Sequence, residues 1–216
     1  MNKNYLLSFA LAGFAFITMG MQCNKEMPPP IIPVFQYTAK LSLTPLKKVY
    51  SINDTIWIEY KTADKTLFDK LSASNISTDT TFLKVFFTLI KQYPIDRNID
   101  TYASVVVENG LDINFGPLVS TRNDLNFITY CNNDPYYFKV GIILLKTGVY
   151  SLQPGAVVSP CPDKKTNLPS TFMYTFDLPD CNYSVWKSIA TQSANGQDSY
   201  IGFGIEGKQI FAIKVE

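Results

Sequence analysis

Lys48-Val49-Tyr50-Ser51-Ile52-Asn53-Asp54-Thr55-Ile56-Trp57-Ile58-Glu59-Tyr60-Lys61 is the stretch of the sequence that decides the fold class. In its second half, Ile56, Ile58 and Tyr60 alternate with Trp57, Glu59 and Lys61. A period of two is typical of a strand with one buried face, and Asn53-Asp54 supplies a turn before it. The pattern predicts a strand from Thr55 to Lys61 whose Ile56, Ile58 and Tyr60 side chains face the core.

Similar segments recur along the chain and predict an all-β fold. They are apolar or alternating, have the length of strands, and are separated by turn residues. About ten short strands, with no helix-length periodic segment between them, favour an antiparallel β-sandwich over a parallel α/β sheet. The predicted strands are residues 34–43, 49–52, 55–61, 82–90, 103–107, 125–130, 136–145, 149–152, 171–176, 200–205 and 209–215.

The segments between these strands are assigned from their composition. Asp64 to Leu71 predicts one or two helical turns, with a plain loop as the alternative. Residues 72–80 are rich in Ser, Thr and Asn and predict an exposed connection. Glu206-Gly207-Lys208 predicts the turn of a closing hairpin. No linker divides residues 34–216, which we expect to form a single β-sandwich domain.

A second hairpin is predicted in the middle of the chain. Lys146-Thr147-Gly148 is a turn sequence between the apolar segments 136–145 and 149–152, and Pro154-Gly155 is expected to end the second one. Residues paired across such a hairpin have numbers that sum to a nearly constant value. The predicted hairpin therefore also determines which residues farther from the turn lie opposite each other.

Composition excludes several classes of function. The chain has 216 residues, a formal net charge of +1 and a pI near 7.5, so nucleic acid is not an expected partner. It has no histidine, which excludes Ser-His-Asp and Cys-His catalysis and any histidine-ligated zinc site. Its four cysteines form no C-x-x-C pair, and we expect no metal and no cofactor.

The N-terminus predicts export. Leu6 to Ile17 is an apolar run of signal-peptide length, too short for a transmembrane helix, and it follows the basic Lys3. No second run long enough to span a bilayer follows. We therefore assign residues 1–22 to a signal peptide.

Cys23 is the candidate lipidation site. Gly20-Met21-Gln22-Cys23 occupies the place of a bacterial lipobox, although Met21 and Gln22 depart from the usual small residues. The proline-rich residues 23–33 suit a tether between a membrane and a folded domain. The prediction is an outer-membrane lipoprotein whose first partner is the membrane. The alternative is a plainly secreted protein, cut after Gly20 or carrying Cys23 in a tail.

Three stretches carry a family resemblance. They are Cys23-Asn24-Lys25-Glu26 with prolines after it, Tyr50-Ser51-Ile52-Asn53-Asp54-Thr55-Ile56-Trp57, and Lys146-Thr147-Gly148-Val149-Tyr150-Ser151-Leu152. Together they resemble a group of uncharacterised Bacteroidota lipoproteins, and the resemblance implies an immunoglobulin-like sandwich. These motifs are structural, namely a strand-entry turn and a hairpin, so the resemblance implies no catalytic residues.

The cysteines allow more than one pairing. An exported protein can keep disulfides, and three cysteines remain if Cys23 is lipidated. The hairpin around Thr147 brings Cys131 and Cys161 to nearly opposite positions, so we expect a Cys131–Cys161 disulfide. Pairing of Cys161 with Cys181 and three unpaired thiols are the alternatives.

Trp57 is the candidate ligand platform. If Ile56, Ile58 and Tyr60 face the core, the Trp57 ring lies outside, where many sugar-binding sandwiches stack a pyranose ring. The alternative is that a loop or a second layer covers the ring. Tyr136-Tyr137 carries the same ambiguity.

Other candidate sites are weaker. Asp96 to Asp100 begins like a calcium loop but lacks the glycine and glutamate that complete one, so we interpret it as a solvated loop. Thr80 and Thr55 follow aspartates and fit a bacterial O-glycan acceptor pattern, with an unmodified threonine as the default. The acidic residues are scattered and single out no catalytic pair.

These observations favour a non-catalytic exported lipoprotein with a binding or structural role at the cell envelope. Its partner is predicted to be a glycan or an envelope protein. The alternative function is a carbohydrate-binding module of a glycan-uptake system. An enzyme, such as a glycosidase with two carboxylates, is the least favoured hypothesis.

Overall fold

The computed structural model describes residues 35–94, 103–109, 111–119, 122–129, 135–161, 170–192 and 199–216. All of them belong to one compact unit, Pro33–Glu216. The predicted signal peptide and linker, including Cys23, lie outside the described residues, as do Cys131 and the rejected calcium loop.

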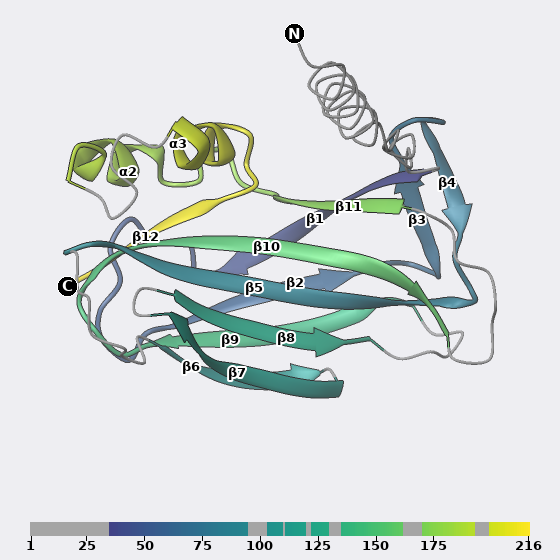
Figure 1. Ribbon diagram of the computed structural model, residues 1–216, viewed down its shortest axis with the longest axis horizontal. Helices are drawn as coiled ribbons and strands as arrows, with labels where there is room; N and C mark the ends of the chain where they lie inside the picture. The colour runs from purple at the N-terminus through teal and green to yellow at the C-terminus, as the bar shows by residue number, and fades with distance from the viewer. Residues whose placement is uncertain are drawn as a thin grey trace, which may run out of the picture. The chain divides into compact units, whose positions relative to one another are not determined.

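Twelve strands and two short helices make up the described fold (Figure 1). The predicted all-β fold, a β-sandwich, is therefore confirmed, with more strands than the expected ten or so. The strands are β1 (Phe35–Thr44), β2 (Thr55–Lys61), β3 (Thr66–Asp69), β4 (Ser74–Ser77), β5 (Thr81–Tyr93), β6 (Ala103–Asn109), β7 (Leu111–Val119), β8 (Arg122–Ile128), β9 (Tyr137–Leu144), β10 (Gly148–Pro160), β11 (Ser170–Phe176) and β12 (Phe211–Val215); the helices are α2 (Tyr183–Ile189) and α3 (Ser199–Glu206).

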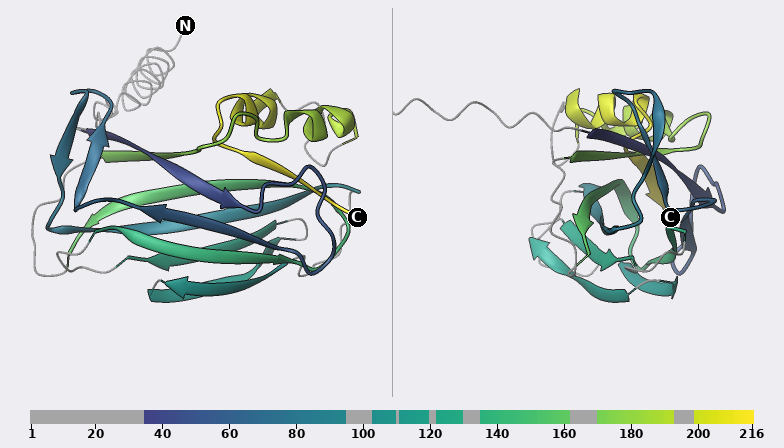
Figure 2. Two further views of the ribbon diagram at one scale, coloured as in Figure 1. Left: turned by 180° about the vertical axis from the view of Figure 1, so that it is seen from behind. Right: turned by 90° about the vertical axis from the view of Figure 1, so that its right-hand side faces the viewer.

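Strand β1 joins the two layers of the sandwich. Its first part, Phe35 to Leu41, pairs in parallel with β11, and its last part, Ser42 to Thr44, pairs antiparallel with β2. The strand order β6-β9-β2-β1-β11-β10-β5-β8-β7 therefore folds over at β1 (Figure 2). β1 belongs both to a four-stranded layer, β6-β9-β2-β1, and to a six-stranded layer, β1-β11-β10-β5-β8-β7. β12 pairs with β10, and β3 pairs with β1 and β4.

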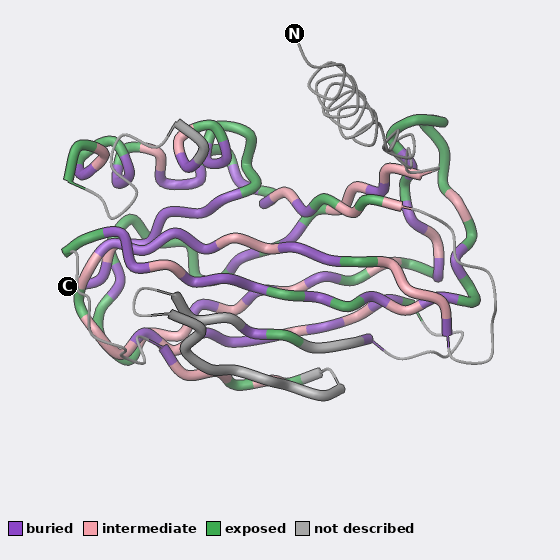
Figure 3. Tube along the Cα trace, viewed as in Figure 1, coloured by how far each residue is buried: buried purple, intermediate pink, exposed green. Residues whose placement is uncertain are grey.

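Strand β2 coincides with the strand predicted from the opening stretch. Ile56 and Ile58 are fully buried and Tyr60 is nearly so, whereas Trp57 and Glu59 are half-buried and Lys61 is exposed. Figure 3 shows buried positions alternating with less buried ones along the strands. The predicted faces of β2 are confirmed.

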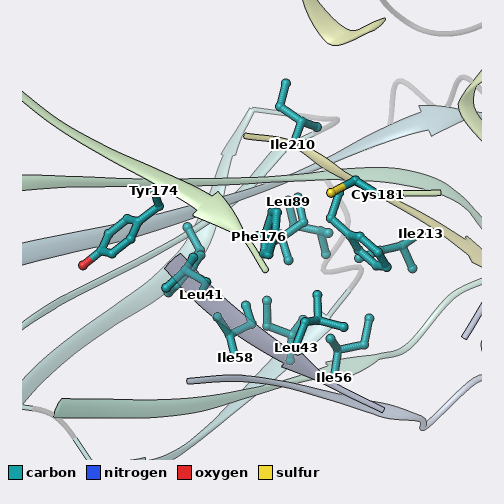
Figure 4. Packing of buried hydrophobic residues seen from close by; sticks show 14 of the residues in the cluster. Leu41, Leu43, Ile56, Ile58, Leu89, Tyr174, Phe176, Cys181, Ile210 and Ile213 are labelled. Atoms are coloured by element: carbon teal, nitrogen blue, oxygen red, sulfur yellow. The ribbon is translucent and has the colours of Figure 1, made fainter. Parts of the chain in front are cut away.

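The core lies between the two layers. In Figure 4, Leu41 and Leu43 of β1 lie beside Ile56 and Ile58 of β2, and Phe176 of β11 lies on their other side. The core becomes aromatic toward its other end. There the ring of Tyr174 meets those of Tyr60, Phe138 and Phe172 at centroid distances of 4.7 to 6.2 Å.

The predicted closing hairpin is wrong in its first strand. Residues 200–205 belong to α3, and only β12 is a strand. Ile201 and Ile205 lie one helical turn apart and are both buried, so the relevant period is near four. α2, which the sequence analysis missed, buries Val185, Trp186 and Ile189. α2 packs on β12 and α3 packs on α2, and four of the five residues of β12 are buried (Figure 1).

The predicted helical turns at Asp64 to Leu71 are also wrong. β3 occupies their centre, with Leu67 buried and Phe68 exposed, and it pairs with both β1 and β4. The buried Asp69 carboxylate holds this segment beside β1, because it accepts the Gln36 backbone N–H at 2.7 Å. It also accepts the Ser72 backbone N–H at 2.9 Å, which stabilises the turn after β3. The expected connection at residues 72–80 contains β4.

The predicted hairpin at Thr147 is wrong as well. β9 pairs with β2 and β6 in one layer, while β10 pairs with β5 and β12 in the other. The chain crosses between layers at this turn because both strands already have partners. Pro154 does not end β10. On one edge of β10, β12 pairs as far as Leu152 and β11 pairs at Ala156. Pro154 lies in the gap between these two partners, where no backbone N–H is needed for pairing.

Candidate functional site

The outer face of the four-stranded layer carries the candidate site. Three cross-strand pairs of β2 and β9 lie on it: Trp57 opposite Gly141, Glu59 opposite Lys139, and Lys61 opposite Tyr137. Alternation along β2 and β9 directs these side chains away from the core. Aromatic and charged groups therefore alternate on a sheet surface whose opposite face is fully packed.

Trp57 lies across Gly141. A Cβ atom on Gly141 would come within 3.0 Å of the indole Cζ3 and within 2.8 Å of the Thr55 methyl group. Glycine is thus required here for the ring to lie close to the sheet. Trp57 is half-buried as a result, and the rest of its ring remains accessible to a ligand.

Lys139 fixes the other side of the arrangement. Its ammonium nitrogen lies 4.7 Å from the centre of the Trp57 ring and 2.5 Å from the Glu108 carboxylate of β6. The hydrogen bond to Glu108 raises the pKa of Lys139, with further contributions from the charges of Glu108, Tyr137 and Glu59. Lys139 therefore remains a cation next to the indole, where a cation–π contact favours this ring position.

The two neighbouring tyrosines have different roles. Lys61 places its ammonium 5.7 Å from the ring centre of the half-buried Tyr137, which repeats the pairing of Lys139 with Trp57. Tyr136 is buried, and its hydroxyl lies 2.6 Å from Thr81 Oγ1 and 2.9 Å from Thr78 Oγ1. Burial raises the pKa of Tyr136. Tyr137 therefore belongs to the candidate site, and Tyr136 belongs to the core.

The outer face of the six-stranded layer has one similar feature. Phe86 of β5 covers Gly155 of β10, where a Cβ atom would come within 2.1 Å of the ring. Phe86 is 40% exposed, and the neighbouring Lys84 lies over the ring of Phe82, at 6.0 Å from its centre, rather than over that of Phe86. It provides a matched comparison for Trp57.

A groove of about 420 Å³ lies between the helices and the loop before α2. Sequence reasoning missed it because neither helix was predicted. Its floor contains the buried Cys181, whose pKa is raised to about 11 by burial, then by the charge of Asp180. The thiol is therefore protonated and unreactive at neutral pH. The lining residues are Pro179, Asp180, Cys181, Tyr183, Ser184, Lys187, Ile205, Glu206 and Lys208.

The cysteines follow the first prediction in part. Cys161 is disulfide-bonded and Cys181 is a free, buried thiol, so the alternative Cys161–Cys181 pairing is wrong, as is the alternative of three unpaired thiols. The partner of Cys161 lies outside the described residues. The Cys131–Cys161 pairing stays a prediction, although the hairpin register that suggested it does not exist.

The remaining candidates have these positions. Thr80 is exposed, whereas Thr55 is half-buried against Gly141. No group of three Cys, Asp or Glu side chains within the described ranges is placed to hold a metal ion. Likewise, no helix in the described part of the chain has the length and hydropathy needed to cross a membrane.

Comparison with known proteins adds little to this description. No protein-family model and no curated protein matches the chain. A solved structure with some similarity is a non-cellulosomal cohesin from the hyperthermophilic archaeon Archaeoglobus fulgidus. The sequence identity is 10% over 64% of this chain and 90% of the cohesin, and the TM-score is 0.24. This likeness is too slight to carry an argument, so the function must be argued from the residues of the chain itself.

Proposed function

We propose that this protein is a non-catalytic lipoprotein of the cell envelope, anchored through Cys23, that binds its partner on the outer face of the layer β6-β9-β2-β1. The observation that carries the proposal is the position of Trp57. Gly141 leaves room for its ring, and the Glu108–Lys139 ion pair holds a cation beside it. Residues from three strands thus fix an aromatic group on the solvent side of the sheet, where packing of the core does not require one.

The charges on this face favour binding over catalysis. Glu59 and Glu108 are its carboxylates, and Lys139 interacts with both. Neither glutamate lines the groove beside α2 or the small hydroxyl-lined cavity near Tyr37. A glycosidase needs two carboxyl groups on either side of a sugar, whereas these two lie on an open sheet surface.

Carbohydrate is the ligand class that we propose as a second, more specific candidate. A half-exposed indole on an open sheet surface can stack on the apolar face of a sugar ring. The neighbouring lysine and glutamate side chains can form hydrogen bonds with the hydroxyl groups of that sugar. Tyr137 supplies a second ring on the same face. This arrangement is consistent with a module that serves glycan uptake.

Two experiments test the proposal. A glycan array with the exported chain tests the ligand class, and the expected result is binding that Trp57→Ala removes. Radiolabelled palmitate and membrane fractionation test the anchor, and the expected result is labelled protein in the membrane fraction. The Cys23→Ser variant should be unlabelled and soluble. Unlabelled wild-type protein would contradict the lipoprotein assignment without affecting the binding face.

A further inference from the structure

The loop between β1 and β2 exposes three aliphatic side chains. Leu46, Val49 and Ile52 are 48%, 41% and 44% exposed, and they recur at every third position. Elsewhere in the described residues, Phe68 and Leu71 form an exposed pair with the same spacing, and the other exposed large apolar side chains are more widely spread along the chain. A concentration of exposed aliphatic groups in one loop marks an interaction site.

The loop is held firmly, so the exposure does not result from a loose chain. The buried Tyr50 donates its hydroxyl to the Pro45 carbonyl at 2.8 Å, and its backbone N–H donates to the Lys214 carbonyl at 2.8 Å. Asp54 accepts the Ser51 backbone N–H at 2.8 Å, and Asn182 donates to the Lys47 carbonyl at 3.0 Å. The aliphatic side chains project from a loop that is already ordered and need no further ordering to bind.

Lysines surround these aliphatic side chains. Lys47 and Lys48 lie in the loop, and Lys47 contacts Asp54 at 2.8 Å. The Asn53 backbone N–H donates to the Leu144 carbonyl at 2.7 Å, which places the turn with Lys146 next to the loop. Glu216 adds a second carboxylate, because its backbone N–H donates to the Tyr50 carbonyl at 2.9 Å and its side chain pairs with Lys214. Among the described residues, four lysines thus accompany two carboxylates at this end of the sandwich.

An exposed aromatic residue completes the surface. Tyr93, the last residue of β5, pairs with Val149 beside the same turn and is exposed. Tyrosine is enriched at the level of lipid headgroups, where its ring is apolar and its hydroxyl is hydrated. Aliphatic, aromatic and basic residues together characterise surfaces that rest in a membrane interface.

We propose that this end of the domain docks on an anionic lipid surface. Leu46, Val49 and Ile52 insert between the headgroups, and Lys47, Lys48 and Lys146 approach the lipid phosphates. The excess of positive charge favours this occupant over a second copy of the chain, whose identical surface would repel it. This surface adjoins the outer face at Thr44, which pairs with Trp57, but it shares none of the residues assigned to that face, so the two proposals can be tested with different variants.

The length of the linker is compatible with docking on the membrane that would hold Cys23. β1 has ten residues and rises about 33 Å between Phe35 and the loop. Residues 24–34 are proline-rich and span about 34 Å when extended at about 3.1 Å per residue. The linker is therefore long enough to cover the length of β1. Docking would restrict the domain to the surface of that membrane.

Sedimentation with vesicles tests the proposal. The exported chain carrying Cys23→Ser, which has no lipid, is mixed with phosphatidylcholine vesicles that contain or lack about one third phosphatidylglycerol. We expect binding only to the anionic vesicles, weakened by salt. The triple variant Leu46→Ser, Val49→Ser and Ile52→Ser should bind at least about tenfold more weakly. Lys48→Glu should weaken binding without changing the apolar side chains.

The matched control changes exposed apolar residues at β3. Phe68→Ser with Leu71→Ser removes two side chains that are also exposed but lie beside the first residues of β1, at the opposite end of that strand from the loop. This variant should bind like the parent, and circular dichroism should show that every variant is folded. Equal binding by the triple variant, or no binding by the folded parent, would overturn the proposal. Dimerisation through the loop without vesicle binding would also overturn it and identify a second copy as the partner.

Discussion

The indole ring of Trp57 lies across Gly141, its direct partner on the neighbouring strand β9. The same relationship recurs between Phe86 and Gly155 on the other layer. In both pairs the glycine has no side chain, and the aromatic ring on the neighbouring strand covers the space above it. The ring thus compensates for the packing that the glycine cannot supply. Only the Trp57 ring also has a lysine beside it within the described residues, and this difference separates the candidate site from a purely structural pair.

Gly141→Ala should displace the Trp57 ring. The new Cβ atom would lie within 3.0 Å of the ring, so the variant should lose about 1–3 kcal/mol of stability in urea unfolding. Its tryptophan fluorescence should shift toward the emission of an exposed indole. Gly202→Ala is the control for the stability measurement, because the nearest atom there, the indole nitrogen of Trp186, is 3.5 Å away and alanine favours a helix. Unchanged fluorescence in Gly141→Ala would contradict the described contact.

The two faces of β2 can be tested with adjacent substitutions. Ile58 is fully buried, so Ile58→Ala should destabilise the protein by about 2–5 kcal/mol through lost burial and a new cavity. Glu59 points outward and is half-buried, so Glu59→Ala should change stability by only about 0.5 kcal/mol. Chemical denaturation measures both values. A near-neutral Ile58→Ala together with a severe Glu59→Ala would reverse the faces and remove Trp57 from the surface.

The sequence was sufficient for β2 but not for the helices or the strand pairing. A period of two is a local signal, and at Thr55 to Lys61 it needs no information from elsewhere in the chain. The segment from Ser199 to Glu206 contains two glycines and alternates much like a strand, and its helical form depends on burial of Ile201 and Ile205. A hairpin sequence such as Lys146 to Gly148 likewise cannot reveal that both flanking strands pair with others.

The candidate site was predictable only in part. The outward position of Trp57 followed from the alternation of β2. Gly141 and Lys139 were not predicted as its neighbours, because they come from a strand about eighty residues away whose register the sequence does not determine. The groove beside α2 was missed for the same reason as the helix itself.

Asp54 should make stability depend on pH. The Lys47 ammonium, then the Ser51 backbone N–H, lower the pKa of Asp54 below its ordinary value of 3.8. The stabilisation is therefore present above that value and is lost as the pH falls through the folded pKa. Asp54→Asn should lower the urea midpoint at neutral pH, and the difference from the wild type should shrink at acidic pH.

The control for this prediction is Asp177→Asn. Asp177 pairs with Lys40 at 3.1 Å, but both side chains are mostly exposed, so its removal should change stability little at either pH. A difference between Asp54→Asn and the wild type that stayed constant with pH would show that the charge of Asp54 is not the cause.

The cysteines should differ in reactivity. Iodoacetamide should leave the buried Cys181 unlabelled in the native protein at neutral pH and label it after unfolding, because burial raises the pKa of the thiol to about 11. Peptide mapping without reductant should recover Cys161 joined to Cys131. A peptide joining Cys161 to Cys23 would contradict that pairing and the lipid anchor together.

Binding to the polysaccharide selected by a glycan array tests the role of the Trp57 face most directly. We expect Trp57→Ala to weaken binding in isothermal titration by about thirtyfold, the effect of losing a contact worth about 2 kcal/mol. Phe86→Ala removes the corresponding ring from the other layer and should leave the affinity unchanged. Equal affinity of folded Trp57→Ala and wild-type protein would show that the ligand binds elsewhere and would contradict the account.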